Sequence, residues 1–159
     1  NVSAALDWLF STQFFGIKLG LDNTGKLLAA ADADRTDATV VHVAGTNGKG
    51  STCAMIEALA RAQGYVTGLF TSPHLVDFSE RIRVNGNMIT PEIFFLKQLA
   101  EGWEQPPTFF ELALAVALRH FRKSGVNFII LETGLGGRLD ATNAVPKDIA
   151  VLAPIGLDH

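Results

Sequence analysis

A glycine-rich segment around Lys49 has the residue types that bind a nucleotide phosphate. The segment is Gly45-Thr46-Asn47-Gly48-Lys49-Gly50-Ser51-Thr52, and it joins the β-branched run Thr39–Ala44 to a helical stretch, Ser51–Ala62. Glycines let backbone N–H groups turn inward around an anion, and the following helix points its positive end at the same place. Lys49 adds a full positive charge for the β- and γ-phosphates. The pattern therefore predicts a phosphate-binding loop.

The match to the common pattern G-x-x-x-x-G-K-[ST] is imperfect. Val43 stands where that pattern has glycine, and Gly50 separates Lys49 from the hydroxyl residues Ser51 and Thr52. One alternative is an ordinary glycine-rich turn with an exposed lysine. Two glycines flanking a lysine directly after a buried strand favour the phosphate loop, with a hydroxyl of Ser51 or Thr52 facing phosphate or metal.

Glu132 and His159 are further candidates, because each follows an apolar strand-like run. Glu132 comes directly after Phe128–Leu131, and in nucleotide-hydrolysing folds a carboxylate at this place often holds Mg²⁺. The alternative is a glutamate that caps the next turn. His159 follows Ile149–Ala153 at the same predicted edge of the sheet, although a lone histidine fits a solvated loop position equally well.

The scaffold that positions these residues is predicted to be an α/β fold with a mainly parallel sheet. The strands are continuous apolar runs separated by helical stretches, which is typical of a sheet with helices on both faces. The expected strands are Thr39–Ala44, Tyr65–Phe70, Asn127–Leu131 and Ile149–Ala153, and Asn85-Gly86 predicts a hairpin turn. Ligands bind beyond the carboxyl ends of such strands, which are followed here by residues 45–51, 71–80, 132–143 and 156–159.

Three helix starts are predicted from capping residues. Asp22 or Asn23 is expected to cap a short helix, and Thr90 is expected to cap another, with the following proline at its first position. Thr108–Arg122 is expected to be a long helix, because Thr108 and Glu111 have the spacing of a capping box.

The composition is that of one globular domain. The chain has 159 residues, of which 48% are apolar and 18% charged, and its net charge is −3. We expect neither nucleic acid nor a membrane as partner, because there is no basic surplus and no apolar run near the roughly 20 residues that span a bilayer. Cys53 is the single cysteine, which excludes an internal disulfide and fits a reducing cytoplasm. The chain stops just after a strand-like run, so we expect a truncated domain, and we expect it to be a monomer.

Taken together, these segments resemble the folylpolyglutamate synthase branch of the Mur ligase family. The resemblance covers nearly the whole chain and is carried by seven segments in a fixed order. They are Phe15–Leu21, His42–Ser51, Thr71–Leu75, Glu80–Arg83, Thr108–Glu111, Leu131–Asn143 and Ile155–His159. Each alone is suggestive, whereas the seven together are highly specific. The glycine inserted after Lys49 is the family's own variant of the phosphate loop.

The resemblance implies roles for individual residues. It implies that the ATP phosphates are bound by Thr46, Asn47, Gly48, Lys49, Gly50 and Ser51, that magnesium is held by Ser72, Glu132 and His159, and that Lys49, Glu132 and His159 are catalytic. It implies a pteroate pocket lined by Lys18, Leu19, Gly20, Thr108, Phe109, Phe110, Glu111, Leu139, Asp140 and Ala141. From the residues alone, Phe109 and Phe110 fit a hydrophobic core equally well, and Ser72 could simply shape the turn before Pro73.

The implied activity is the ATP-driven joining of L-glutamate to the carboxylate of dihydropteroate or a reduced folate. ATP would convert this carboxylate to an acyl phosphate, which the glutamate amine attacks. The family combines a Mur ligase-type central domain with a C-terminal glutamate ligase domain. We therefore expect residues 1–159 to be a part of the ATP-binding domain that is inactive alone.

Two other functions are left open. One is a Mur-type ligase for a peptidoglycan precursor, which Gly50, the loop around Pro73 and Thr108–Glu111 disfavour. The other is a non-catalytic nucleotide-binding module, which would need the phosphate loop but not Ser72, Glu132 and His159 together.

Overall fold

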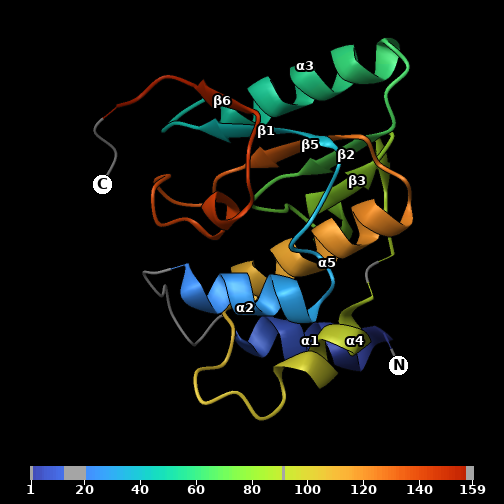
Figure 1. Ribbon diagram of the computed structural model, residues 1–159, viewed down its shortest axis with the longest axis vertical. Coiled ribbons are helices and arrows are strands. Elements are labelled where there is room, and N and C mark those ends of the chain that lie inside the picture. Colours follow the sequence, from blue (N-terminus) through green and yellow to red (C-terminus); the bar gives the residue numbers. More distant parts are fainter. Residues whose placement is uncertain (1, 13–20, 91, 157–159) are drawn as a thin grey trace.

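A six-stranded sheet forms the centre of the molecule (Figure 1), and its strand order is β4-β3-β2-β5-β1-β6. The computed structural model describes residues 2–12, 21–90 and 92–156. The strands are β1 Thr39–Ala44, β2 Thr67–Phe70, β3 Ile82–Val84, β4 Asn87–Met88, β5 Phe128–Glu132 and β6 Ile149–Leu152. The pairs among β2, β5, β1 and β6 are parallel, while β3 and β4 run antiparallel. The predicted mainly parallel sheet is confirmed.

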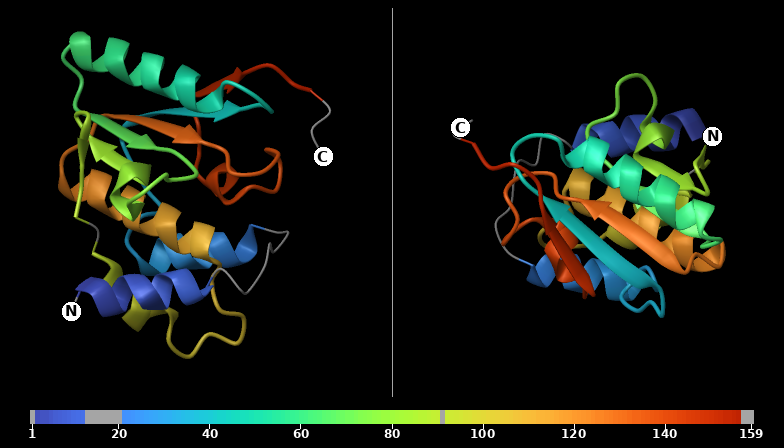
Figure 2. Two further views of the ribbon diagram at one scale, coloured as in Figure 1. Left: turned by 180° about the vertical axis from the view of Figure 1, so that it is seen from behind. Right: turned by 90° about the horizontal axis from the view of Figure 1, so that it is seen from above.

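Helices cover both faces of the sheet, as predicted (Figures 1 and 2). Helix α3 (Lys49–Ala62) packs on β1, β2 and β5 from one side, and α5 (Phe109–Lys123) packs on the other. Helices α1 (Val2–Ser11), α2 (Asp22–Ala30) and α4 (Ile93–Ala100) form a further layer against α5. The larger hydrophobic core lies on the α5 side of the sheet, where most of the buried apolar side chains gather.

The alternation of side chains along the central strands separates two environments. Val43 on β1 and Ile130 on β5 pack with Cys53 of α3. Leu131, the next residue on β5, belongs to the core on the α5 side. Because successive strand residues point to opposite faces, Glu132 lies on the same face as Ile130, toward α3 and the loop before it.

Two local predictions are confirmed. The side chain of Thr108 accepts from the N–H of Glu111 and the side chain of Glu111 accepts from the N–H of Thr108, which completes the predicted capping box of α5. Asn85 and Gly86 have φ angles of 49° and 79°, the left-handed pair that a two-residue hairpin turn requires. The Asn85 carboxamide also accepts from the N–H of Thr67 at 2.9 Å, which ties the hairpin to β2.

Two predicted helix caps are wrong. Helix α2 is preceded by Leu21 as its N-cap, so Asp22 lies in the first turn and not before it. Helix α4 has Glu92 as its N-cap, not Thr90. The N–H of Ile89 still donates to the carbonyl of Ile82 at 3.2 Å, which keeps the chain attached to the sheet edge up to residue 89. The chain therefore needs further residues to leave the sheet before a helix begins.

Helix α3 begins at Lys49, two residues before the predicted start. Gly48 is its N-cap and has φ 77°, a left-handed conformation that suits glycine. The N–H of Thr52 donates to the carbonyl of Gly48 at 2.9 Å, which closes the first turn. The second half of the glycine-rich segment is therefore the first turn of the helix. None of the helices in the described ranges is long and apolar enough to cross a membrane.

Candidate active site

The glycine-rich loop between β1 and α3 is held in place by the chain that follows β6. The N–H groups of Thr46 and Asn47 donate to the carbonyl of Pro154 at 2.9 and 3.3 Å. A Cβ on Gly45 would lie 2.8 Å from the Cβ of Ala153, so only glycine allows the two segments to approach this closely. These contacts between segments far apart in sequence fix the path of the loop.

The start of α3 presents unpaired donors and one ammonium group at this loop. The first N–H groups of a helix have no partner inside it, and the helix dipole makes this end positive. The Lys49 ammonium lies 3.4 Å from the carbonyl of Thr46, folded back over the loop. Of the two candidate hydroxyls, that of Thr52 donates to the carbonyl of Gly48 at 2.8 Å, whereas Ser51 is exposed. The arrangement suits a bound phosphate.

The Glu132 carboxylate lies against this helix start. Its side chain is 4% exposed, and Oε2 accepts from the N–H of Ser72 at 2.9 Å. A Cβ on Gly50 would lie 3.7 Å from Oε1, an ordinary contact distance, so the carboxylate lies directly against the first turn of α3. Burial raises the pKa of Glu132, while the Ser72 N–H and the charge of Lys49 lower it. The fold thus brings three of the predicted site residues together.

These residues could bind a divalent cation only together with other oxygen donors. No cluster of three or more His, Cys, Asp or Glu side chains in residues 2–12, 21–90 and 92–156 could hold a metal by itself. Mg²⁺ keeps several waters and is usually bound by one or two carboxylates together with substrate phosphates. One oxygen of the Glu132 carboxylate accepts from the N–H of Ser72, and the carboxylate lies next to a helix start that suits phosphate. This arrangement matches that donor set.

A cavity of about 690 Å³ opens beside the phosphate loop. It lies between Ala44–Thr46 with Lys49, the loop Gly134–Gly137, and residues of the chain from Leu152 to Gly156. Leu152 and Ile155 are largely exposed at its edge. The cavity thus combines an anion-binding wall with an apolar rim, which suits a nucleotide or another phosphate ester with an apolar group.

Phe110 and Asp140, two of the predicted pocket residues, meet at Gly134. A Cβ on Gly134 would lie 2.9 Å from the Phe110 ring and 3.2 Å from Oδ2 of Asp140. The Phe110 ring is half-buried and also packs on Phe70, with 5.5 Å between ring centroids. The Asp140 carboxylate accepts from the N–H of Gly134 at 2.8 Å, and so it shapes the loop beside the phosphate site.

Most of the other described residues of the predicted pteroate pocket are engaged in packing or capping. Phe109 is buried and stacks on Phe10 at 5.8 Å between centroids. Glu111 is 4% exposed, and besides capping α5 it accepts from the hydroxyl of Thr24 at 2.7 Å. Ala141 is buried as well, whereas Leu139 is 44% exposed. Lys18, Leu19, Gly20 and His159 lie outside the described residues.

Arg81 and His42 are site residues that the sequence interpretation did not single out. Arg81 is buried and donates from Nε to Nδ1 of His74 at 2.7 Å. His42 is buried on β1, and its Nε2 lies 2.6 Å from the hydroxyl of Thr142. Nothing in the local pattern marks either residue, except that each falls within one of the family-like segments.

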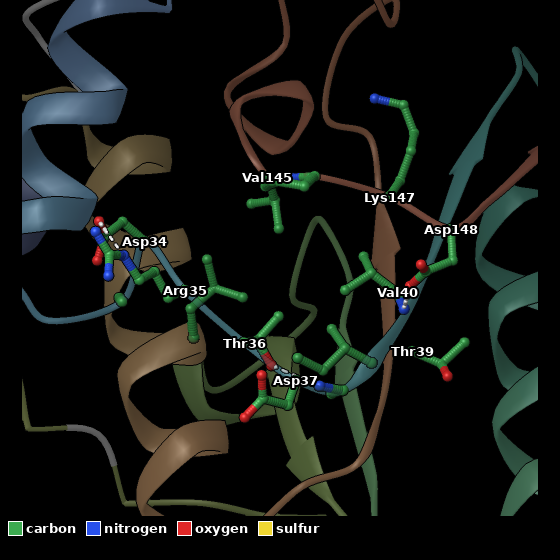
Figure 3. Close-up of a pocket in the computed structure, with 14 residues that line it drawn as sticks. Asp34, Arg35, Thr36, Asp37, Thr39, Val40, Val145, Lys147 and Asp148 are labelled. Carbon is green, nitrogen blue, oxygen red and sulfur yellow. Dashed lines mark hydrogen bonds and ion pairs between the residues drawn. The ribbon is translucent and has the colours of Figure 1, made fainter.

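A second cavity, of about 410 Å³, lies at the opposite end of the strands (Figure 3). Its polar groups are largely paired with each other. Asp148 accepts from the N–H of Val40 at 2.8 Å, and the hydroxyl of Thr36 accepts from the N–H of Ala38 at 3.1 Å. Figure 3 shows Lys147 extending away from Asp148. This second cavity lies at the amino end of β1, away from the phosphate loop. We therefore place the candidate site at the carboxyl ends of the strands.

Comparison with known proteins finds a matching family and similar solved structures. Residues 43–159 match the Mur ligase middle domain. The dihydrofolate synthase/folylpolyglutamate synthase of Bacillus subtilis is 40% identical over 168 residues, which cover 98% of this chain and 38% of the relative. Among solved structures, Escherichia coli FolC in complex with DHPP and ADP has a TM-score of 0.87 and 40% identity, with 98% of this chain and 39% of that chain covered.

A second solved structure is a bifunctional folylpolyglutamate synthase/dihydrofolate synthase with Mn, AMPPNP and L-glutamate bound. Its TM-score is 0.88 and its identity 36%, with 98% of this chain and 39% of that chain covered. The chain thus spans about two fifths of the length of these three proteins.

Proposed function

The chain belongs to the Mur ligase family, and we propose that it is the ATP-binding part of a ligase that joins L-glutamate to a pteroate or folate carboxylate. The observation that carries the proposal is the meeting of Glu132, Gly50 and Ser72 at the carboxyl ends of the strands. A buried carboxylate against a phosphate-binding helix start suits transfer of a phosphoryl group. The relatives solved with ADP and with AMPPNP, Mn and L-glutamate support the choice of nucleotide, metal and amino acid.

The proposed reaction has two displacement steps. An oxygen of the acceptor carboxylate attacks the γ-phosphorus of ATP, so a new O–P bond forms and the bond to the β-phosphate oxygen breaks, releasing ADP. The amine of glutamate then attacks the acyl carbon. The C–N bond forms, phosphate leaves with the former carboxylate oxygen, and the amine loses a proton. Neither step requires a side-chain nucleophile, so catalysis consists of positioning and charge control.

The residues of the site would control charge where two anions meet. Lys49 and the start of α3 would hold the β- and γ-phosphates, with Thr46 to Ser51 around them. Ser72 and Glu132, together with His159, would hold a divalent cation, for which we propose Mg²⁺. The cation, when bound, would neutralise charge on the transferred phosphoryl group. Phe110, Leu139 and the residues around them would face the pterin.

The length of the relatives supports a proposal about domain organisation. Because they are about two and a half times as long, we propose that residues 1–159 form part of the ATP-binding domain and that a glutamate ligase domain lies outside them. We also propose that the whole protein is a cytoplasmic monomer. On this view, residues 1–159 alone bind nucleotide but do not ligate. Glutamate-dependent ATP turnover by these residues alone would contradict the domain assignment.

The proposed function is tested by phosphate release from Mg-ATP by the full gene product. The assay contains glutamate and either dihydropteroate or tetrahydrofolate. We expect release that depends on glutamate and on at least one pterin acceptor, and the pair of acceptors distinguishes a single from a dual activity. If a folded, ATP-binding protein releases phosphate only with a peptidoglycan precursor, the acceptor is wrong. If ATP binding is indifferent to magnesium and to Glu132→Ala, a non-catalytic nucleotide-binding module is the better account.

A further inference from the structure

Arg81 is a buried cation whose charge interacts with Glu132 without a close ion pair to it. Its residue is 7% exposed, at the junction of the short helix Phe78–Arg81 with β3. No carboxylate of the described ranges forms an ion pair with it. Arginine is rarely buried unless it is paired, because removing its charge from water is unfavourable. The guanidinium therefore has no directly bonded carboxylate in the described part of the chain, and a bound anion would supply one.

Two contacts fix the orientation of the guanidinium group. Its Nε donates to Nδ1 of His74 at 2.7 Å, and its central carbon lies 5.1 Å from the centroid of the Phe109 ring. Because Nδ1 of His74 accepts this bond, the imidazole is neutral. The guanidinium donates no hydrogen bond to the described residues other than the one from Nε to His74. Its terminal amino groups are therefore available to a ligand.

Arg81 lies near Glu132 in the candidate site. Glu132 interacts electrostatically with two cations, Lys49 of the phosphate loop and Arg81 directly before β3. The backbone links the same places, because the N–H of Thr71 donates to the carbonyl of Arg81 at 2.9 Å and Ser72 binds Glu132. Lys49 is the cation proposed above to bind the phosphates, which leaves Arg81 as the cation for the acceptor. Phe109, beneath the guanidinium, belongs to the segment next to Phe110.

We propose that Arg81 binds the acceptor carboxylate of the pteroate or folate substrate and holds it for attack on the γ-phosphorus. The inference rests on the proposed function above. A guanidinium held over an aromatic ring offers two parallel N–H donors that match the two oxygens of a carboxylate. His74 and Phe109 are then positioning residues that act through Arg81. The same charge offsets the repulsion between the acceptor carboxylate and the triphosphate.

A cycle of protein and ligand variants tests the contact in the full gene product. Binding of dihydropteroate and of its carboxamide, in which a neutral amide replaces the carboxylate, is measured by calorimetry with Mg²⁺ and a non-hydrolysable ATP analogue. We expect the wild type to prefer the acid by about tenfold or more. Arg81→Gln should reduce this preference to near one while nucleotide affinity stays unchanged. Arg83→Gln is the matched control, since this arginine lies two residues further along and is half-buried, and it should keep the preference.

The outcomes separate this contact from a structural role and from a wrong acceptor. If Arg81→Gln weakens both ligands equally, Arg81 supports the fold through His74 and Phe109, and the inference is overturned. If Arg81→Gln does not fold, Arg81→Lys decides, because it keeps the charge without the two-donor geometry. It should weaken the acid several-fold more than the amide, and equal weakening would overturn the inference. If the wild type binds neither ligand, the proposed function fails, and this inference fails with it.

Discussion

The imidazole of His42 and the hydroxyl of Thr142 lie 2.6 Å apart, although 100 residues separate them in the chain. The Thr142 hydroxyl donates its single proton to Oδ1 of Asp140 at 2.5 Å, so it must accept from Nε2–H of His42. The other oxygen of Asp140 accepts from the N–H groups of Gly134 and Leu135 at 2.8 and 3.0 Å. A continuous chain of hydrogen bonds thus runs from the central strand to the loop that lines the phosphate cavity.

Replacing Thr142 with valine breaks this chain at its centre. The variant leaves His42 without its acceptor and removes one donor from Asp140, so we expect a loss of about 1–3 kcal/mol in the free energy of unfolding. We also expect weaker nucleotide binding, because the loop from Gly134 loses part of its anchor. Chemical denaturation and nucleotide titration measure the two effects.

Thr133→Val is the matched control for Thr142→Val. Thr133 is 1% exposed and Thr142 is fully buried, but the Thr133 hydroxyl has no hydrogen-bond partner in the described part of the chain. Its replacement should be neutral or stabilising, because a buried unpaired hydroxyl is unfavourable. Equal losses of unfolding free energy for the two variants would mean that the hydrogen bonds of Thr142 do not contribute to stability beyond side-chain packing.

Glu132→Gln is expected to remove metal-dependent turnover and keep the fold. The glutamine carbonyl can still accept from the N–H of Ser72, whereas the charge that attracts a cation is lost. We expect the affinity for Mg²⁺ in the presence of ATP to fall by at least about tenfold to a hundredfold. The unfolding midpoint should stay near that of the wild type or rise, since burial of this charge is unfavourable. An unchanged magnesium dependence would contradict the assignment of Glu132.

Glu80 gives the loop after Ser72 a pH-dependent stability. Its carboxylate accepts from the N–H groups of Leu75, Val76 and Asp77 at 2.8–2.9 Å, and these bonds lower its pKa from 4.5 to about 2. Because the folded pKa lies below the ordinary value, this stabilisation is complete above pH 4.5 and is lost as the pH falls toward 2.

Thermal denaturation of the wild type and of Glu80→Gln tests this relation. The stability difference between them should be constant above pH 5 and should shrink as the pH is lowered through 4.5 toward 2. A difference that is the same at neutral pH and at pH 3 would show that the carboxylate charge does not hold the loop.

Cys53 is expected to be inert. It is fully buried, and burial first, then the charge of Glu132, raise the pKa of its thiol to about 12. The thiolate that reacts with thiol reagents is therefore almost absent at pH 8. We expect negligible labelling of the native protein, complete labelling after denaturation, and unchanged ATP turnover for Cys53→Ala. Rapid labelling of the native protein with loss of turnover would contradict this view.

Predictions that depended on local pattern were the most accurate. The capping box of Thr108 and Glu111 and the Asn85-Gly86 turn involve partners only a few residues apart, so the sequence contains the whole interaction. The apolar runs also located the parallel strands, because a strand buried on both faces has no polar alternation. The cap at Thr90 was wrong because a distant contact, from Ile89 to Ile82, kept the chain on the sheet.

The sequence could not identify interaction partners that lie far apart along the chain. Glu111 was identified as a cap, but its second bond goes to Thr24, 87 residues away. Asp140 was expected to line a pocket, and its carboxylate in fact accepts four hydrogen bonds from its own loop and from Thr142. Arg81 could not be recognised as an unpaired charge until its surroundings were known. In each case the partner is brought close only by the fold.

The most direct test of the proposed ligase is to follow an oxygen atom. The full gene product is given Mg-ATP, glutamate and dihydropteroate whose carboxylate carries ¹⁸O in both positions, and the released phosphate is analysed by mass spectrometry. An acyl-phosphate route transfers one carboxylate oxygen to phosphate, so each phosphate released should contain one ¹⁸O. Phosphate without ¹⁸O would mean that water or another group attacks ATP, and it would contradict the account of the site built around Lys49 and Glu132.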